Sequence, residues 1–153
     1  MPFDAREPRL DDEDDDEKQG EPNAFLEEAL FKARTILIYG GIDQKIAKEV
    51  SARLLALQAA GDEPITIFIN SQGGHVESGD TIYDMIKFVK PEVRVVGTGW
   101  VASAGALIYA AAKKENRFSL PNTRFLLHQP SGGAGGTASD VAIQAKEIIR
   151  MRK

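Results

Sequence analysis

The sequence predicts an α/β fold in which a largely parallel sheet is flanked by helices. Short apolar segments rich in β-branched residues alternate with longer segments whose apolar residues recur at helical spacing. Glycines follow the apolar segments, where a chain leaving a strand needs a turn. Strands that alternate with helices in this way form βαβ units with right-handed crossovers. We therefore expect one compact α/β domain.

The composition narrows the class of protein. A chain of 153 residues with 42% hydrophobic residues is large enough for one core. The absence of cysteine excludes disulfides, thiolate catalysis and cysteine zinc sites, and it fits a reducing compartment. No apolar run approaches the roughly 20 residues that cross a bilayer, and the N-terminus lacks a signal-peptide pattern. We expect a cytoplasmic protein without a membrane partner.

The acidic charge is concentrated at the N-terminus. Residues 1–22 hold ten acidic and three basic side chains, whereas the remaining residues hold thirteen acidic and sixteen basic ones. The run from Asp11 to Glu17 repels itself and has little to bury, which predicts a disordered acidic tail over 1–22 and a folded domain over 23–153. Nucleic-acid binding needs a basic surface, so we expect no nucleic-acid partner.

The first elements follow this tail. A short amphipathic helix is predicted from Ala24 to about Arg34, with Asn23 as its cap. The β-rich segment 35–39 is predicted to be a buried strand that ends at Gly40 and Gly41. A second helix is predicted between Asp43, a plausible N-cap, and Gly61, which stops it.

The same unit then repeats. Residues 65–69 are predicted to form a second buried strand, followed by a turn at Gly73 and Gly74 and by a helix that ends before Pro91. Residues 93–96 are the third predicted strand.

The remaining elements lead to the C-terminus. A helix of small residues is predicted from Ser103 to about Lys113, followed by short β segments around 117–119 and 124–127. The last predicted helix begins at Ser139 and continues without a stop signal, so we interpret the chain as incomplete at its C-terminus.

Ser103 is the candidate nucleophile. It follows the third predicted strand and begins a helix, and its small neighbours permit a sharp turn like a nucleophile elbow. The strict G-x-S-x-G pattern is not met, because Val101 stands at the first glycine position. An ordinary helix cap is the alternative for this serine.

The chain offers only two histidines for a general base. Histidine suits this role near neutral pH because its unperturbed pKa is about 6.5. His128 ends a predicted strand and is the preferred base, with a structural role left open. His75 follows the glycine pair with no strand to fix it, so we interpret it as a loop side chain near the site.

The N–H groups of Gly74 and Ala104 are the candidate oxyanion donors. Gly74 lies where a parallel strand ends, the edge at which open α/β sheets bind ligands, and it carries no Cβ to obstruct a substrate. Ala104 directly follows the candidate nucleophile. A plain glycine turn is the alternative.

Taken together, these segments resemble the proteolytic subunits of the Clp protease family. The similarity spans about residues 34 to 153, with 29 residues from Gly74 to Ser103 and 25 from there to His128. The matching blocks are Ile69-Asn70-Ser71-Gln72-Gly73-Gly74, Gly79 to Asp84, Phe88 to Pro91, the Ser103 segment, Arg117 to Asn122, Leu127 to Gly133 and Ala145 to Ile149.

The resemblance implies a crotonase-like fold of repeated ββα units that ends in an incomplete handle helix. It implies an ATP-dependent serine endopeptidase, without cofactor or metal, that hydrolyses unfolded proteins and peptides. It also implies two stacked seven-membered rings fed by an AAA+ Clp unfoldase. Ser103 would be the nucleophile, His128 the base, and Gly74 and Ala104 the oxyanion hole. Extended substrate would pair with two stretches that comprise Gly73, His75, Val76, Ser131, Gly132 and Gly133.

Three features depart from the family pattern. Gln72 replaces the usual proline, and Ser131 replaces a large apolar residue. The third is the triad aspartate, which in this family lies about fifty residues beyond the histidine, outside the chain, and neither Asp140 nor Glu147 is assigned to its role. We therefore expect the chain by itself to be feebly active or inactive. Two alternatives remain, a catalytically impaired assembly or regulatory subunit and a crotonase-like acyl-CoA enzyme.

Overall fold

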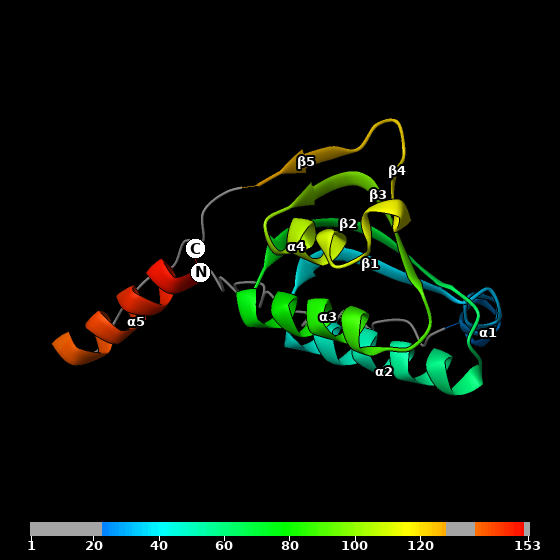
Figure 1. Cartoon of the computed structure of the whole chain (residues 1–153), viewed down its shortest axis with the longest axis horizontal. Coiled ribbons are helices and arrows are strands. Elements are labelled where there is room, and N and C mark those ends of the chain that lie inside the picture. Colours follow the sequence, from blue (N-terminus) through cyan, green and yellow to red (C-terminus); the bar gives the residue numbers. More distant parts are fainter. Residues whose placement is uncertain (1–22, 128–136, 152–153) are drawn as a thin grey trace, which may run out of the picture.

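The computed structural model describes residues 23–127 and 137–151 and shows the predicted α/β architecture. Figure 1 shows a strongly twisted sheet with α2 and α3 lying together against one side of it. In chain order the elements are α1 (Ala24–Lys32), β1 (Thr35–Ile42), α2 (Gln44–Ala60), β2 (Ile65–Gly74), α3 (Val76–Phe88), β3 (Val93–Ala102), α4 (Ala104–Ala110), the 3₁₀ turn η1 (Lys114–Asn116), β4 (Arg117–Ser119), β5 (Arg124–Leu126) and α5 (Ala138–Met151).

The sheet is parallel at every described strand pair, which confirms the predicted sheet type. The long strands β1, β2 and β3 lie side by side in chain order. On its other side, β3 pairs with two short strands in turn. Residues 95–97 of β3 pair with β4, and residues 100–102 pair with β5. The helices between the strands therefore act as crossover connections, as the alternating pattern predicted.

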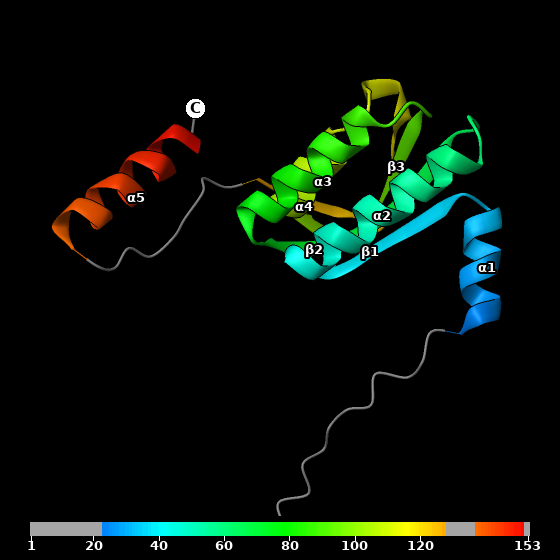
Figure 2. The ribbon, with the colours of Figure 1, turned by 90° about the horizontal axis from the view of Figure 1, so that it is seen from below.

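Over the described part of the chain, helices cover one face of the sheet. In β1, Ile36 and Ile38 are each 1% exposed, whereas Leu37 and Tyr39 are 50% and 53% exposed. Both views show α2 and α3 on the side of the covered face (Figures 1 and 2). The prediction of a buried strand at 35–39 therefore holds for one face only, because alternate side chains point away from the helices.

The strands run further than the sequence predicts, and their carboxyl ends form the candidate site. Gly40 and Gly41 do not end β1, because Gly40 takes a φ of 82° and a register shift between Tyr39 and Gly41 carries the strand on to Ile42. Likewise, Gly73 and Gly74 are the last residues of β2 and pair with Gly41 and Ile42. The glycines thus lie inside the ladder rather than in a separate turn.

The helix ends show the predicted caps and one that the sequence did not reveal. Asn23 accepts hydrogen bonds from two N–H groups of α1, and Asp43 accepts one from the N–H of Ile46 at 2.8 Å. The guanidinium of Arg34 donates to the carbonyls of Leu57, Gly61 and Glu63, each at 3.0 Å, and closes the C-terminal end of α2. This long-range cap has no local sequence signal.

The two terminal helices contribute little to the core. No residue of α1 is buried, and Phe25 is 81% exposed, so the predicted apolar face of this helix is not covered. Figures 1 and 2 both show α5 standing apart from the sheet. No described helix is long and apolar enough to cross a membrane.

The core packing of α2 can be tested with two neighbouring leucines. Leu54 is fully buried and Leu55 is 44% exposed. Because Leu54→Ala leaves a cavity in the core, we expect it to lower the free energy of unfolding by about 2–5 kcal/mol. Leu55→Ala should change it by only about 0.5 kcal/mol. Urea unfolding at one protein concentration checks this, and equal losses would contradict the packing described.

Candidate active site

Ser103 forms a sharp turn between β3 and α4. Its φ of 54° and ψ of −122° lie outside the regions that non-glycine residues prefer, at a cost of about 1–3 kcal/mol. Its side chain makes no capping hydrogen bond to α4. The ordinary helix-cap alternative is therefore wrong, and the predicted sharp turn is confirmed.

The turn is held from one side by β5. Residues 100–102 of β3 pair with residues 124–126 of β5, and the N–H of Ser103 donates to the carbonyl oxygen of Leu126 at 3.0 Å. The strand segment that precedes His128 therefore ends beside Ser103. His128 itself, like Ser131, Gly132 and Gly133, lies outside the described residues.

The glycine pair of β2 holds the turn from the other side. A Cβ on Gly73 would lie 2.7 Å from the Cβ of Ser103 and 3.1 Å from the nitrogen of Ala104. A Cβ on Gly74, whose φ is 152°, would overlap the carbonyl oxygen of Ile42. Both positions require glycine, because any side chain would push β1, β2 and the Ser103 turn apart.

The backbone donors in this region are unequally available. The N–H of Gly73 donates to the hydroxyl of Ser71 at 3.1 Å, and Ser71 is only 1% exposed. Ala104 is the first residue of α4, so its N–H has no partner within the helix. The structure thus places Gly73 against both Ser103 and Ala104, and it leaves Gly74 exposed at the end of β2.

Small residues behind the turn bring the elements together. A Cβ on Gly105 would lie 2.9 Å from the carbonyl oxygen of Ser71, and one on Gly79 would lie 3.0 Å from the Cβ of Ala104. The N-terminal ends of α3 and α4 can therefore approach each other and β2 closely. Ser71, Gly79 and Gly105 lie in the motif segments of the sequence, but their role in packing the turn appears only in the structure.

His75 is held more firmly than the sequence predicts. It directly follows β2, and its N–H donates to the carbonyl of Ile42 at 2.9 Å. Its Nδ1 lies 2.7 Å from the hydroxyl of Ser78, and its Nε2 lies 2.6 Å from a carboxylate oxygen of Glu77. His75 is thus a connecting residue as predicted, but the expectation that no strand fixes it is wrong, because it directly follows β2 and is hydrogen-bonded to Ile42.

Val76 also differs from the expectation of an extended substrate-pairing stretch. It is the first residue of α3, so the extended backbone ends at His75. The carbonyl of Val76 enters the first turn of α3, whereas its N–H, like that of Ala104, has no partner within the helix.

Asp140 caps α5. One oxygen of its carboxylate accepts hydrogen bonds from the N–H and the hydroxyl of Thr137 at 2.9 and 2.6 Å, and the N–H of Asp140 donates to that hydroxyl at 3.2 Å. The hydrogen bonds from Thr137 lower the pKa of Asp140 below its usual value. This carboxylate is therefore used by its own helix, and the side chain of Glu147 lies outside what the structure describes.

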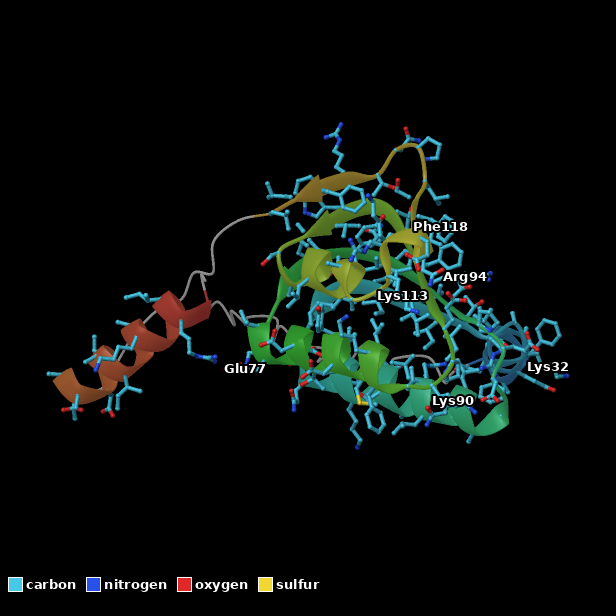
Figure 3. The ribbon with its side chains drawn as sticks, in the orientation of Figure 1. Lys32, Glu77, Lys90, Arg94, Lys113 and Phe118 are labelled. Carbon is cyan, nitrogen blue, oxygen red and sulfur yellow. The ribbon has the colours of Figure 1, made fainter. Side chains whose placement is uncertain are left out.

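A cavity of about 460 Å³ lies elsewhere. It is bordered by Lys87 and Lys90 at the C-terminal end of α3 and by Lys113 after α4. In Figure 3, Lys90 and Lys113 lie at the opposite end of α3 from Glu77. The 13 residues of α3 separate this cavity from the glycine pair by about 20 Å, so it is not the reaction site. Within the described residues, no cluster of side chains could hold a metal ion.

A serine on a strained turn from strand to helix, flanked by a glycine pair, places the chain among hydrolases that use a serine nucleophile. Residues 18–153 match the family model described as Clp protease, and the chain belongs to that family. The predicted family is thereby confirmed, and with it the prediction of a serine peptidase.

Relatives and solved structures agree. The chain is 62% identical over 146 residues to the ATP-dependent Clp protease proteolytic subunit 3 of Rhizobium johnstonii, covering 94% of this chain and 75% of that protein. It is 54% identical over 147 residues to subunit 2 of Pseudomonas aeruginosa, covering 95% and 73%. A mutant of ClpP1 from Listeria monocytogenes superposes with a TM-score of 0.76 at 64% identity, covering 83% and 70%. These relatives do not favour the regulatory-subunit or acyl-CoA alternatives.

The requirement for glycine at position 74 can be separated from simple backbone strain. Gly40 also has a positive φ, but a Cβ there would meet nothing within 4 Å. Gly40→Ala should therefore cost only about 1–2 kcal/mol of folding free energy. Gly74→Ala adds a collision with Ile42, so we expect a larger loss of stability together with loss of peptidase activity. Thermal unfolding measures the stability of the two variants, and peptide hydrolysis measures their activity. Equal losses in Gly40→Ala and Gly74→Ala would refute the close approach of Gly74 to Ile42.

The hydrogen bonds of Thr137 predict how Asp140 titrates. Because its folded pKa lies below the ordinary 3.8, its contribution to α5 is full above that pH and is lost as the pH falls through the folded value. We expect the carboxyl carbon resonance of Asp140 to titrate below 3.8, and Thr137→Ala to move the midpoint upward. An unchanged midpoint in this variant would contradict the cap.

Proposed function

We propose that Ser103 is the nucleophile and His128 the general base of this peptidase. The supporting observation is the hydrogen bond from the N–H of Ser103 to Leu126. Because His128 follows two residues later, its Cα can lie at most about 7 Å from that of Leu126, the ladder partner of Ala102. This limit on the distance from Leu126 supports the assignment of His128 as the base.

The reaction follows from these positions. His128 takes the proton of the Ser103 hydroxyl as Oγ attacks the carbonyl carbon of a peptide bond. The N–H groups of Gly74 and Ala104 bind the developing oxyanion, where each donor is worth about 10² to 10³ in rate. His128 then protonates the leaving amine, and water hydrolyses the acyl-enzyme by the same steps in reverse. The third member of the triad is not assigned.

The substrate is an extended, unfolded polypeptide. Its backbone pairs with the glycine pair at the end of β2 on one side and with the loop of Ser131, Gly132 and Gly133 on the other. Support comes from Gly74, which is exposed where the strand ends. Because the backbone of the substrate supplies most of the contacts, selectivity for its side chains is weak.

The partners are a Clp ATPase that delivers substrate and further copies of this chain. The relatives are named as subunits of ATP-dependent proteases, which supports both. Apolar side chains of Leu37, Tyr39, Phe118 and Phe125 are each 46% to 53% exposed, which is surface that association would bury. Two stacked rings of seven subunits, in the cytoplasm, are the specific form that we propose.

Labelling with a fluorophosphonate tests the nucleophile. In the assembled protein expressed from its own gene, the probe should modify Ser103, and Ser103→Ala should abolish labelling. Ser119→Ala is the matched control, because Ser119 is an exposed serine in β4 outside the site. Failure to label the assembled wild type, or persistent labelling of Ser103→Ala, would refute the assignment.

A further inference from the structure

Three side chains connect the first turns of α2 and α3 next to the glycine pair. The Nδ1 of His75 lies 2.7 Å from the hydroxyl oxygen of Ser78, and that hydroxyl donates to Oε1 of Gln44 at 3.0 Å. Ser78 is 0% exposed. Gln44 is the first residue of α2, and Ser78 lies in the first turn of α3.

The proton positions in this network follow from its geometry. The single hydroxyl proton of Ser78 is given to Gln44, so the serine oxygen accepts from Nδ1–H of His75. On the other side of the ring, Nε2 faces a carboxylate oxygen of Glu77, which can only accept.

The two hydrogen bonds of His75 differ in their surroundings. Glu77 is 78% exposed and the side chain of His75 is 54% exposed, so water competes strongly for the contact between these two side chains. The hydroxyl of Ser78 is buried, and a buried polar group that loses its partner is costly. The bond to Ser78 is therefore the one that fixes the ring. In Figure 3, Glu77 marks the end of α3 at which this network lies.

The network of Gln44, Ser78 and His75 joins the two chain segments whose contact positions Gly74. Gly74 packs against the backbone of Ile42, and the N–H of His75 donates to the carbonyl of the same residue. Gln44 follows Ile42 by two residues, and His75 directly follows Gly74. Two successive glycines have many accessible backbone conformations, so an external restraint is needed to hold one of them.

We propose that Gln44, Ser78 and His75 are positioning residues that hold the N–H of Gly74 in the direction of the oxyanion. The inference rests on the proposed function of Gly74 as an oxyanion donor. The network acts on the transition state through the backbone and makes no contact with the leaving group. It therefore affects the rate of acyl transfer more than the binding of the peptide.

Two amide substitutions separate the hydrogen bonds of His75. The amide nitrogen of His75→Asn can take the place of Nδ1 and donate to Ser78, whereas that of His75→Gln takes the place of Nε2 and reaches Glu77. His75→Ala removes both bonds. Asp84→Asn is the control, because it removes an exposed carboxylate from α3 away from the network.

Peptide hydrolysis and fluorophosphonate labelling are measured for each variant in the assembled protein. For His75→Ala, His75→Gln and Ser78→Ala, we expect kcat and the labelling rate to fall by about 10-fold to 100-fold with KM within about 2-fold. His75→Asn should recover most of the lost rate, and Asp84→Asn should resemble the wild type. Because the residues act as one unit, His75→Ala combined with Ser78→Ala should be little slower than either alone.

Hydrogen exchange gives a readout that does not depend on activity. Amide exchange of the peptide spanning 70–79 should accelerate by about 10-fold in His75→Ala and return toward the wild-type rate in His75→Asn. If Ser78→Ala fails to fold, the three His75 variants still test whether the network positions Gly74.

Several results would overturn the inference. A rise in KM with unchanged kcat would mean that His75 contacts the peptide instead, and equal rescue by His75→Gln would mean that Glu77 is the essential partner. Unchanged rates, or unchanged amide exchange, in His75→Ala would show that the network does not position the N–H of Gly74. Absence of labelling at Ser103 in the wild type would refute the proposed function, and the inference with it. Labelling of the wild type together with unaffected variants would refute the inference alone.

Discussion

The close approach of β1, β2 and β3 at their carboxyl ends is the constraint on which the candidate site depends. Gly74 packs on the backbone of Ile42, and Gly73 lies against Ser103 with no room for a Cβ on either glycine. On the far side, Leu126 accepts the N–H of Ser103. Ser103 is thus held between the end of β2 and the end of β5. These contacts offset the cost of its strained backbone.

That strain has a functional meaning within the Clp protease family to which the chain belongs. A serine with an ordinary helix-capping geometry would bond its hydroxyl to the helix, whereas Ser103 makes no such bond. The positive φ turns the chain so sharply that the next N–H, on Ala104, begins the helix beside the glycine pair. The turn therefore presents a hydroxyl and a backbone donor together, which acyl transfer requires.

The same strand ends organise the surroundings. His75 leaves β2 through a hydrogen bond to Ile42 and is joined through Ser78 to Gln44 at the start of α2. Two helix N-termini and two strand ends therefore meet within one hydrogen-bonded cluster. By contrast, Leu37 and Tyr39 on the other face of the sheet are half exposed among the residues that the structure describes.

The sequence alone determined the order of strands and helices and the caps at Asn23 and Asp43. It also singled out Ser103 as the serine at the sharp turn from strand to helix. Periodicity, capping and motif spacing are all local signals. Only the tertiary structure decided that Gly40 continues β1, that Leu37 faces outward, and that His75 is tied to Ser78 and Gln44. These depend on which residues from distant segments become neighbours, and on which face of the sheet is covered. Neither is encoded in the spacing of residues along one element.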